Sequence, residues 1–164
     1  MQINKNQKTA IIAFLLIITI AIPLSATSAA VPTHHKATHA FIGATPNPVG
    51  VGQETLIHLG ITDELQSTAN GWEGLTVTVT KPDNSTTTIG PIRTDATGGT
   101  GIIFAPDQLG TYYLQLNFPA QWFNWTTSGG ANIWYEASTS EKLALVVTNQ
   151  PVTYYPGQPL PTEY

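Results

Sequence analysis

The chain lacks cysteine altogether and has little charge: none of its 164 residues is Cys, and charged residues make up 10% of the sequence. The absence of cysteine excludes disulfide bonds and metal sites built on thiolates, so stability must come from packing. Ten acidic residues against six basic ones give a formal net charge of −4. This balance argues against nucleic acid as a partner, because binding to phosphates depends on a basic surface.

The N-terminal segment 1–30 has the organisation of a signal peptide. Lys5 and Lys8 precede an apolar run from Ala10 to Leu24, and Ser28-Ala29-Ala30 supplies the small residues of a cleavage site. The alternative is an uncleaved N-terminal anchor, although about 15 apolar residues are few for a membrane span. Both interpretations predict an exported protein that is secreted or held at the cell surface, with membrane contact only through this segment.

The rest of the chain divides into three segments. Residues 31–39 have no apolar periodicity, and we expect a flexible N-terminus there. Residues 40–149 contain the strand patterns of one domain. Residues 150–164 contain prolines at positions 151, 156, 159 and 161, which predict an extended linker or tail. We expect this linker to lead into further protein.

Residues 75–80 give the clearest strand pattern, because Leu75, Val77 and Val79 alternate with threonines. Similar alternation predicts later strands, and the turn sequence "PDNS" predicts a hairpin. Prolines and glycines in residues 46–52 break an edge strand into two pieces that switch partners. Seven to eight short strands without a helical pattern predict an all-β fold, an immunoglobulin-like antiparallel β-sandwich.

A turn and a tyrosine stand just before one of these strands, in the sequence "PDQLGTYYLQLNF". Asp107, Gly110 and Tyr112 could belong to a catalytic turn, but a catalytic carboxylate at Asp107 would need a second titratable partner, and none is near it in the sequence. In immunoglobulin-like folds a tyrosine early in the penultimate strand hydrogen-bonds the corner before it, while a glycine takes the unusual backbone angle. We therefore interpret these three residues as a fold-defining corner.

The segment "TDATGGTGIIFAPDQLGTYYLQLNF" resembles bacterial and archaeal immunoglobulin-like surface domains. More specifically, "ATPNPVGVGQETLIHLGITD", "GWEGLTVTVTKPD" and "YYPGQPLPTEY" are similar to the N-terminal module of exported archaeal proteins that continue into a β-propeller of the pyrroloquinoline-quinone-like repeat type. The resemblance covers residues 40–164 and implies a downstream β-propeller as partner. The chain itself contains no propeller, so no activity of such a domain is carried over to these residues.

An aromatic segment, "FPAQWFNWTTSGGANIWYEAST", lies where a connection of two to five residues would suffice. We expect a long irregular connection over 119–139, and long connections are often functional. Its aromatic side chains could close one end of the core, anchor a protein interface or form a platform for glycans. The candidate ligand or partner residues are Trp122, Phe123, Trp125, Trp134 and Tyr135.

Metal binding has only weak support. His34, His35 and His39 lie close in sequence, but no carboxylate or thiol accompanies them, and His58 is expected on a solvent-facing strand position. Calcium could use loop carboxylates, although no Asp-x-Asp spacing concentrates their charge. The carboxylates concerned are Asp63, Glu64, Glu73 and Asp95. We expect no metal site.

Two Asn-x-Ser/Thr sequons make Asn84 and Asn124 candidates for glycosylation, as in an exported glycoprotein. The chain has no Gly-x-Ser-x-Gly motif and no cysteine nucleophile. The sequence therefore predicts a protein that is not an enzyme, carries no cofactor and serves as a spacer, adhesion or protein-interaction domain at a cell surface. The alternative is a carbohydrate-binding accessory domain that uses the aromatic residues of 119–137.

Overall fold

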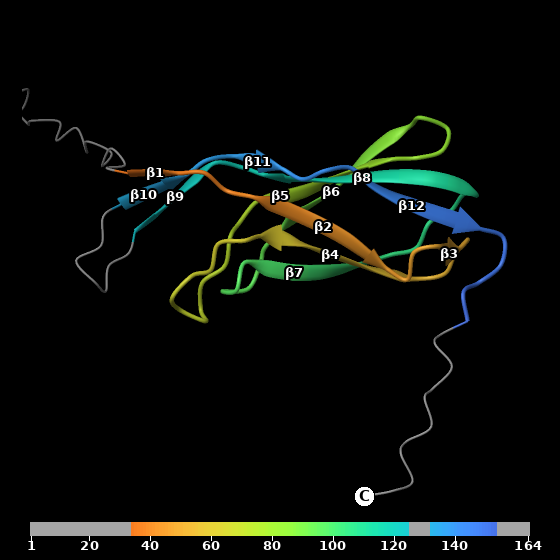
Figure 1. Ribbon diagram of the computed structural model, residues 1–164, viewed down its shortest axis with the longest axis horizontal. Helices are drawn as coiled ribbons and strands as arrows, with labels where there is room; N and C mark the ends of the chain where they lie inside the picture. Colours follow the sequence, from red (N-terminus) through yellow and green to blue (C-terminus); the bar gives the residue numbers. More distant parts are fainter. Residues whose placement is uncertain (1–33, 125–131, 154–164) are drawn as a thin grey trace, which may run out of the picture. The chain divides into compact units, whose positions relative to one another are not determined.

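The computed structural model describes residues 34–124 and 132–153 (Figure 1). The predicted signal peptide, the greater part of the predicted linker and Trp125 lie outside these residues. The described residues form an all-β structure of twelve strands without a helix. Within those ranges there is accordingly no helix of the length and apolar character that a membrane span needs.

The strands are β1 (His34–Lys36), β2 (Ala40–Thr45), β3 (Val49–Gly50), β4 (Thr55–Ile61), β5 (Leu75–Thr80), β6 (Thr86–Ile92), β7 (Gly99–Phe104), β8 (Gly110–Phe118), β9 (Gln121–Asn124), β10 (Asn132–Tyr135), β11 (Ser138–Thr139) and β12 (Leu143–Thr148). They form three sheets. A six-stranded sheet has the order β3-β12-β8-β5-β6, with β11 also paired to β8. Two three-stranded sheets have the orders β2-β4-β7 and β1-β10-β9.

Between β2 and β3 the chain passes from one sheet to another. Strand β2 pairs antiparallel with β4, whereas β3 pairs in parallel with β12 in the six-stranded sheet (Figure 1). Pro46 and Pro48 lie between the two pieces, where proline ends the ladder because it has no backbone N–H to donate. The predicted edge strand that switches partners is confirmed.

One hydrophobic core joins the sheets, because the strands that line it, such as β5, β8 and β12, bury alternate side chains. In β5, Leu75, Val77 and Val79 are fully buried, as the alternation with threonine predicts. Further buried side chains come from β4 of one sheet and from β8 and β12 of the other, and all belong to a single cluster. Across the sheets, the rings of Phe104 and Tyr112 lie 5.7 Å apart in an edge-to-face contact.

Two expectations about irregular segments are wrong. His34–Lys36, placed in a flexible N-terminus by the sequence, form β1 and pair in parallel with β10. Residues 119–139, expected to be irregular, contain β9, β10 and β11, and β9 pairs antiparallel with β10. The partner of β1 is about 100 residues away along the chain, so no local pattern reveals the pairing.

Candidate functional site

The β9–β10 hairpin holds four of the five aromatic residues proposed from the sequence as a ligand or partner site. Trp122 lies directly opposite Trp134, and Phe123 lies opposite Ile133. Because successive side chains of a strand point to opposite faces, the two tryptophans share one face of the sheet, and Phe123 and Tyr135 share the other. The fifth residue, Trp125, lies outside the described residues.

The inner face of the hairpin packs on the core through Trp72. The Trp72 ring centroid lies 4.5 Å from that of Tyr135 and 6.0 Å from that of Phe123. Its Nε1–H donates a hydrogen bond to the backbone oxygen of Asp63 at 2.7 Å, and the side chain is 1% exposed. Phe123 and Tyr135 therefore extend the core, which is the first of the three roles that the sequence left open.

Trp72 was not singled out from the sequence, although a signal was present. It stands in "GWEG", three residues before the clearest strand pattern of the chain. An indole in that position covers one end of the core with its large apolar area, while its N–H donates a hydrogen bond. The role of Trp72 explains why aromatic residues of a distant hairpin can be buried.

The outer face of the hairpin carries the two tryptophans away from the core. Trp122 is 50% exposed, Trp134 is half-buried, and neither belongs to the core cluster. His35 in β1 is the register partner of Trp134, so one row crosses the three strands from His35 through Trp134 to Trp122. We call these three residues the outer row. No local pattern in the sequence indicates that His35 joins the tryptophans.

Polar groups lie in the outer row and beside it. His35 Nδ1 lies 2.5 Å from Glu136 Oε1, and both side chains are exposed to a large extent. The backbone oxygen of Glu136 accepts a hydrogen bond from the hydroxyl of Thr38 at 2.8 Å, and its N–H donates to the backbone oxygen of Lys36 at 2.9 Å. Asn132 lies two residues from Trp134 on the same face of β10. The row therefore has hydrogen-bonding groups at its margin.

Lys36 ties β1 to the rest of the domain on the inner face. Its ammonium group forms an ion pair with Asp63 and lies 5.7 Å from the centroid of the Tyr135 ring. The hydrogen bond to Asp63 raises the pKa of Lys36 above its ordinary value. The carboxylate of Asp63 is nearly buried, so its pairing with Lys36 helps to fix the strand that supplies His35.

The other carboxylates considered for calcium have separate partners. Glu73 pairs with Arg93 at 2.6 Å, and Asp95 accepts hydrogen bonds from the hydroxyl and backbone N–H of Thr97, which lower the pKa of Asp95. Glu64 is exposed, as is His58 in β4. In the residues that the structure describes, no three His, Asp or Glu side chains are grouped so as to hold a metal ion.

The structure also brings together the residues of the predicted corner between β7 and β8. Tyr112 is fully buried, and its hydroxyl accepts a hydrogen bond from the backbone N–H of Gln108 at 2.9 Å and donates one to Asp107 Oδ1 at 2.6 Å. Burial, followed by the hydrogen bond to Asp107, raises the pKa of Tyr112. Gly110 has φ of 120°, and a Cβ there would lie 3.0 Å from Cβ of Pro82, so both backbone angle and space favour glycine.

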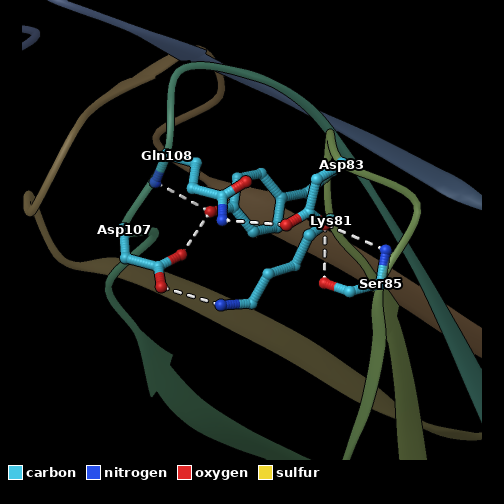
Figure 2. A network of polar contacts seen from close by, with 6 residues as sticks. Lys81, Asp83, Ser85, Asp107 and Gln108 are labelled. Carbon is cyan, nitrogen blue, oxygen red and sulfur yellow. Dashed lines mark hydrogen bonds and ion pairs between the residues drawn. The ribbon is translucent and has the colours of Figure 1, made fainter.

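Further polar contacts join this corner to the turn between β5 and β6 (Figure 2). Lys81 Nζ lies 2.7 Å from Asp107 Oδ2, and Gln108 Nε2 donates to Asp83 Oδ2 at 3.3 Å. Asp83 also accepts hydrogen bonds from Ser85. The Lys81 ammonium, followed by the Tyr112 hydroxyl, lowers the pKa of Asp107. These contacts leave the carboxylate of Asp107 paired and ionised.

The two sequons have different positions. Asn84 lies in the exposed turn between β5 and β6 with φ of 65°, a left-handed backbone angle that asparagine tolerates. Asn124 ends β9 opposite Asn132, and its side chain lies outside the description.

Comparison with known proteins gave no match to a protein family, to a curated protein or to a solved structure.

Proposed function

We propose that this chain is an exported, immunoglobulin-like module that works without catalysis, as a spacer, adhesion or protein-interaction domain at a cell surface. The observation that carries the proposal is the edge that leaves one sheet as β2 and enters the other as β3. The order β12-β8-β5-β6 corresponds to strands G, F, C and C′ of a variable-type immunoglobulin β-sandwich, and β2-β4-β7 corresponds to A, B and E.

The Tyr112 corner supports the same assignment. In immunoglobulin-like β-sandwiches a tyrosine near the start of strand F hydrogen-bonds the backbone a few residues upstream. Tyr112 lies near the start of β8, and its hydroxyl bonds the N–H of Gln108. In this proposal Asp107, Gly110 and Tyr112 define the fold and take no part in binding.

An uncharged face of the six-stranded sheet supports a protein partner. Strands β5, β6, β8 and β12 contain no charged residue. Depletion of charge around exposed aromatic and apolar side chains is typical of the centre of protein interfaces, and Tyr113 is 47% exposed here. We call this surface the threonine face. Its residues are Thr76, Thr78, Thr80, Thr86, Thr88, Thr111, Tyr113, Gln115, Asn117, Ala144 and Val146.

Export is supported by the sequence of residues 1–30. The exposed position of Asn84 suits an acceptor for N-glycosylation, which occurs on surface turns of exported proteins. The partner of the threonine face is a surface protein or, as the resemblance to propeller-linked modules implies, another domain of the same polypeptide. Labelling of intact cells with a membrane-impermeant biotin reagent tests export: labelling of the chain is expected, and protection equal to that of a cytoplasmic protein would contradict it.

Beads coated with the full chain test the interaction. We expect intact cells of the producing organism, deleted for the gene, to capture these beads. Tyr113→Lys and Thr88→Lys should each reduce capture several-fold, because a buried unpaired charge opposes association. Ile103→Lys is the matched control, since Ile103 is 61% exposed on β7 of the other sheet. Equal capture of all four proteins would count against the threonine face, and no capture of wild-type beads would count against a partner on a separate surface protein.

A further inference from the structure

The outer row of the β1-β10-β9 sheet is a surface that the core does not use. Trp122 is 50% exposed although tryptophan in a small domain normally buries much of its area. The register fixes its neighbour, because residues directly opposite in an antiparallel pair have Cβ atoms about 4.5–5.5 Å apart, and Trp134 occupies that place. Two indoles thus stand side by side on the outward face of the sheet.

We propose that this outer row binds neutral glycans, with pyranose rings stacked on Trp122 and Trp134. The C–H groups on one face of a pyranose form an apolar surface that complements the face of an indole, whose π-system is negative. The ring hydroxyls point outward from such a stack. They require hydrogen-bonding groups at the margin of the aromatic surface.

His35 and Glu136 meet that requirement. Their mutual contact uses His35 Nδ1 and Glu136 Oε1, so it does not involve Nε2 of the imidazole or Oε2 of the carboxylate. A carboxylate oxygen accepts a hydrogen bond from a hydroxyl, and an imidazole nitrogen can donate or accept according to its tautomer. His35 lies in β1, Glu136 follows β10 directly, and Asn132 begins β10, so all three lie in or next to the strands of this sheet.

Charge favours a neutral ligand over a charged polymer. Among the residues that the structure describes, the ionisable side chains that we place in or beside the outer row are His35 and Glu136, which contact each other. Lys36 points to the opposite face, where it pairs with Asp63. Neither an excess of positive charge for an acidic polysaccharide nor an excess of negative charge for a cationic polymer is present on this face, and salt-sensitive attraction is not expected.

The size of the aromatic surface favours a narrow ligand over a protein. A tryptophan side chain buries about 150–250 Å², so two of them offer at most about 500 Å². A standard protein interface buries about 800 Å² on each partner. A glycan chain that contacts two indoles and a few polar groups matches the smaller surface. This inference depends on the outer row alone and not on the proposed role of the threonine face.

Affinity electrophoresis of the full chain tests the inference, in native gels that contain a soluble β-glucan, a mannan or a galactan. We expect at least one of these neutral polysaccharides to retard the wild-type protein. Trp122→Ala should weaken the apparent affinity by about tenfold or more, the scale of losing an aromatic anchor. Trp122→Phe should retain part of it, because a smaller ring still stacks.

Two controls separate binding of neutral glycans at the outer row from binding through the threonine face and from attraction by charge. Tyr113→Ala removes an aromatic side chain of similar exposure from the threonine face and should leave retardation unchanged. Polygalacturonate replaces the neutral polymers by an acidic one and should not retard the protein. Absence of retardation in all three neutral gels, retardation only by polygalacturonate, or equal retardation of wild-type and Trp122→Ala protein would overturn the inference. None of these results bears on bead capture through the threonine face.

Discussion

The β7–β8 corner and the β9–β10 hairpin both present aromatic side chains, but they use them in opposite ways. Tyr112 has its ring in the core, and both hydrogen bonds of its hydroxyl go to neighbouring protein groups. Trp122 has half its surface exposed to solvent. An aromatic residue whose polar tip is satisfied by the protein contributes to stability, whereas one that directs its face outward is available for binding. The comparison predicts different consequences for substitutions in the two regions.

The largest loss of stability is expected at Trp72, which anchors the inner face of the hairpin. Trp72→Ala removes ring contacts with Phe118, Phe123 and Tyr135 and should lower the free energy of unfolding by about 3–5 kcal/mol. Urea denaturation measures this change. Trp72→Phe should cost less, although the carbonyl of Asp63 loses its donor. If the free energy of unfolding of Trp72→Ala were within about 1 kcal/mol of that of wild type, packing of the hairpin on Trp72 would not stabilise the fold.

A smaller loss is expected at the corner. Tyr112→Phe removes the hydroxyl and its two hydrogen bonds while the ring stays in place, so the free energy of unfolding should fall by about 1 kcal/mol or somewhat more. Polysaccharide retardation should be unchanged. Tyr113→Phe is the control at the adjacent residue. Because Tyr113 faces solvent, this substitution should change the free energy of unfolding by nearly zero. Wild-type stability of Tyr112→Phe would undo the assignment of the corner.

The corner should also make stability depend on pH in the acid range. The pKa of Asp107 is lowered below its ordinary value of 3.8, chiefly by Lys81. A carboxyl with a lowered pKa in the folded state stabilises the fold above its unfolded pKa, and this contribution is lost as the pH falls through the folded pKa. The melting temperature of Asp107→Asn should therefore lie below that of wild type near pH 7, and the two should converge as the pH falls below about 3.8.

Two measurements sharpen that prediction. The Tyr112→Phe and Asp107→Asn changes should be less than additive, because both act on the hydrogen bond between Tyr112 and Asp107: the first removes its donor, and the second replaces its charged acceptor by a weaker neutral one. A constant difference in melting temperature between wild type and Asp107→Asn from about pH 7 to about pH 2 would contradict a stabilising role of the ionised carboxylate.

The smallest change in stability is expected in the outer row. Trp122→Ala removes a half-exposed side chain that lies outside the core cluster, so its free energy of unfolding should stay within about 0.5 kcal/mol of wild type. Urea denaturation in parallel with Trp72→Ala compares the same substitution at two tryptophans. A loss above about 2 kcal/mol at Trp122 would mean that this side chain serves the fold.

The strands of the main sheets could be predicted because their patterns are local. Strand β5 alternates valine and leucine with threonine, and the buried and outward positions follow that alternation. Pro46 and Pro48 likewise indicated where the edge strand changes partner. The corner could be predicted because Asp107, Gly110 and Tyr112 stand within six residues of one another. Short-range patterns of this kind depend on backbone geometry alone.

Four aromatic residues of the hairpin were singled out from the sequence, but their arrangement in a sheet could not be predicted, for two physical reasons. Strands β9 and β10 carry aromatic side chains on both faces, so no polar and apolar alternation distinguishes inside from outside. Strand β1 pairs with a segment about 100 residues away, and its own three residues are all polar and exposed. The row from His35 to Trp122 is therefore a product of tertiary pairing, and only the register of the sheet reveals it.

The most direct test compares Trp122→Ala and Tyr112→Phe in one native gel that contains the polysaccharide retarding the wild-type protein. Our account predicts that Tyr112→Phe, the less stable variant, is retarded as strongly as wild type. Trp122→Ala, with wild-type stability, should migrate nearly as it does without polysaccharide. Equal retardation of both variants, or loss of retardation in Tyr112→Phe alone, would contradict the division between a structural corner and a binding hairpin.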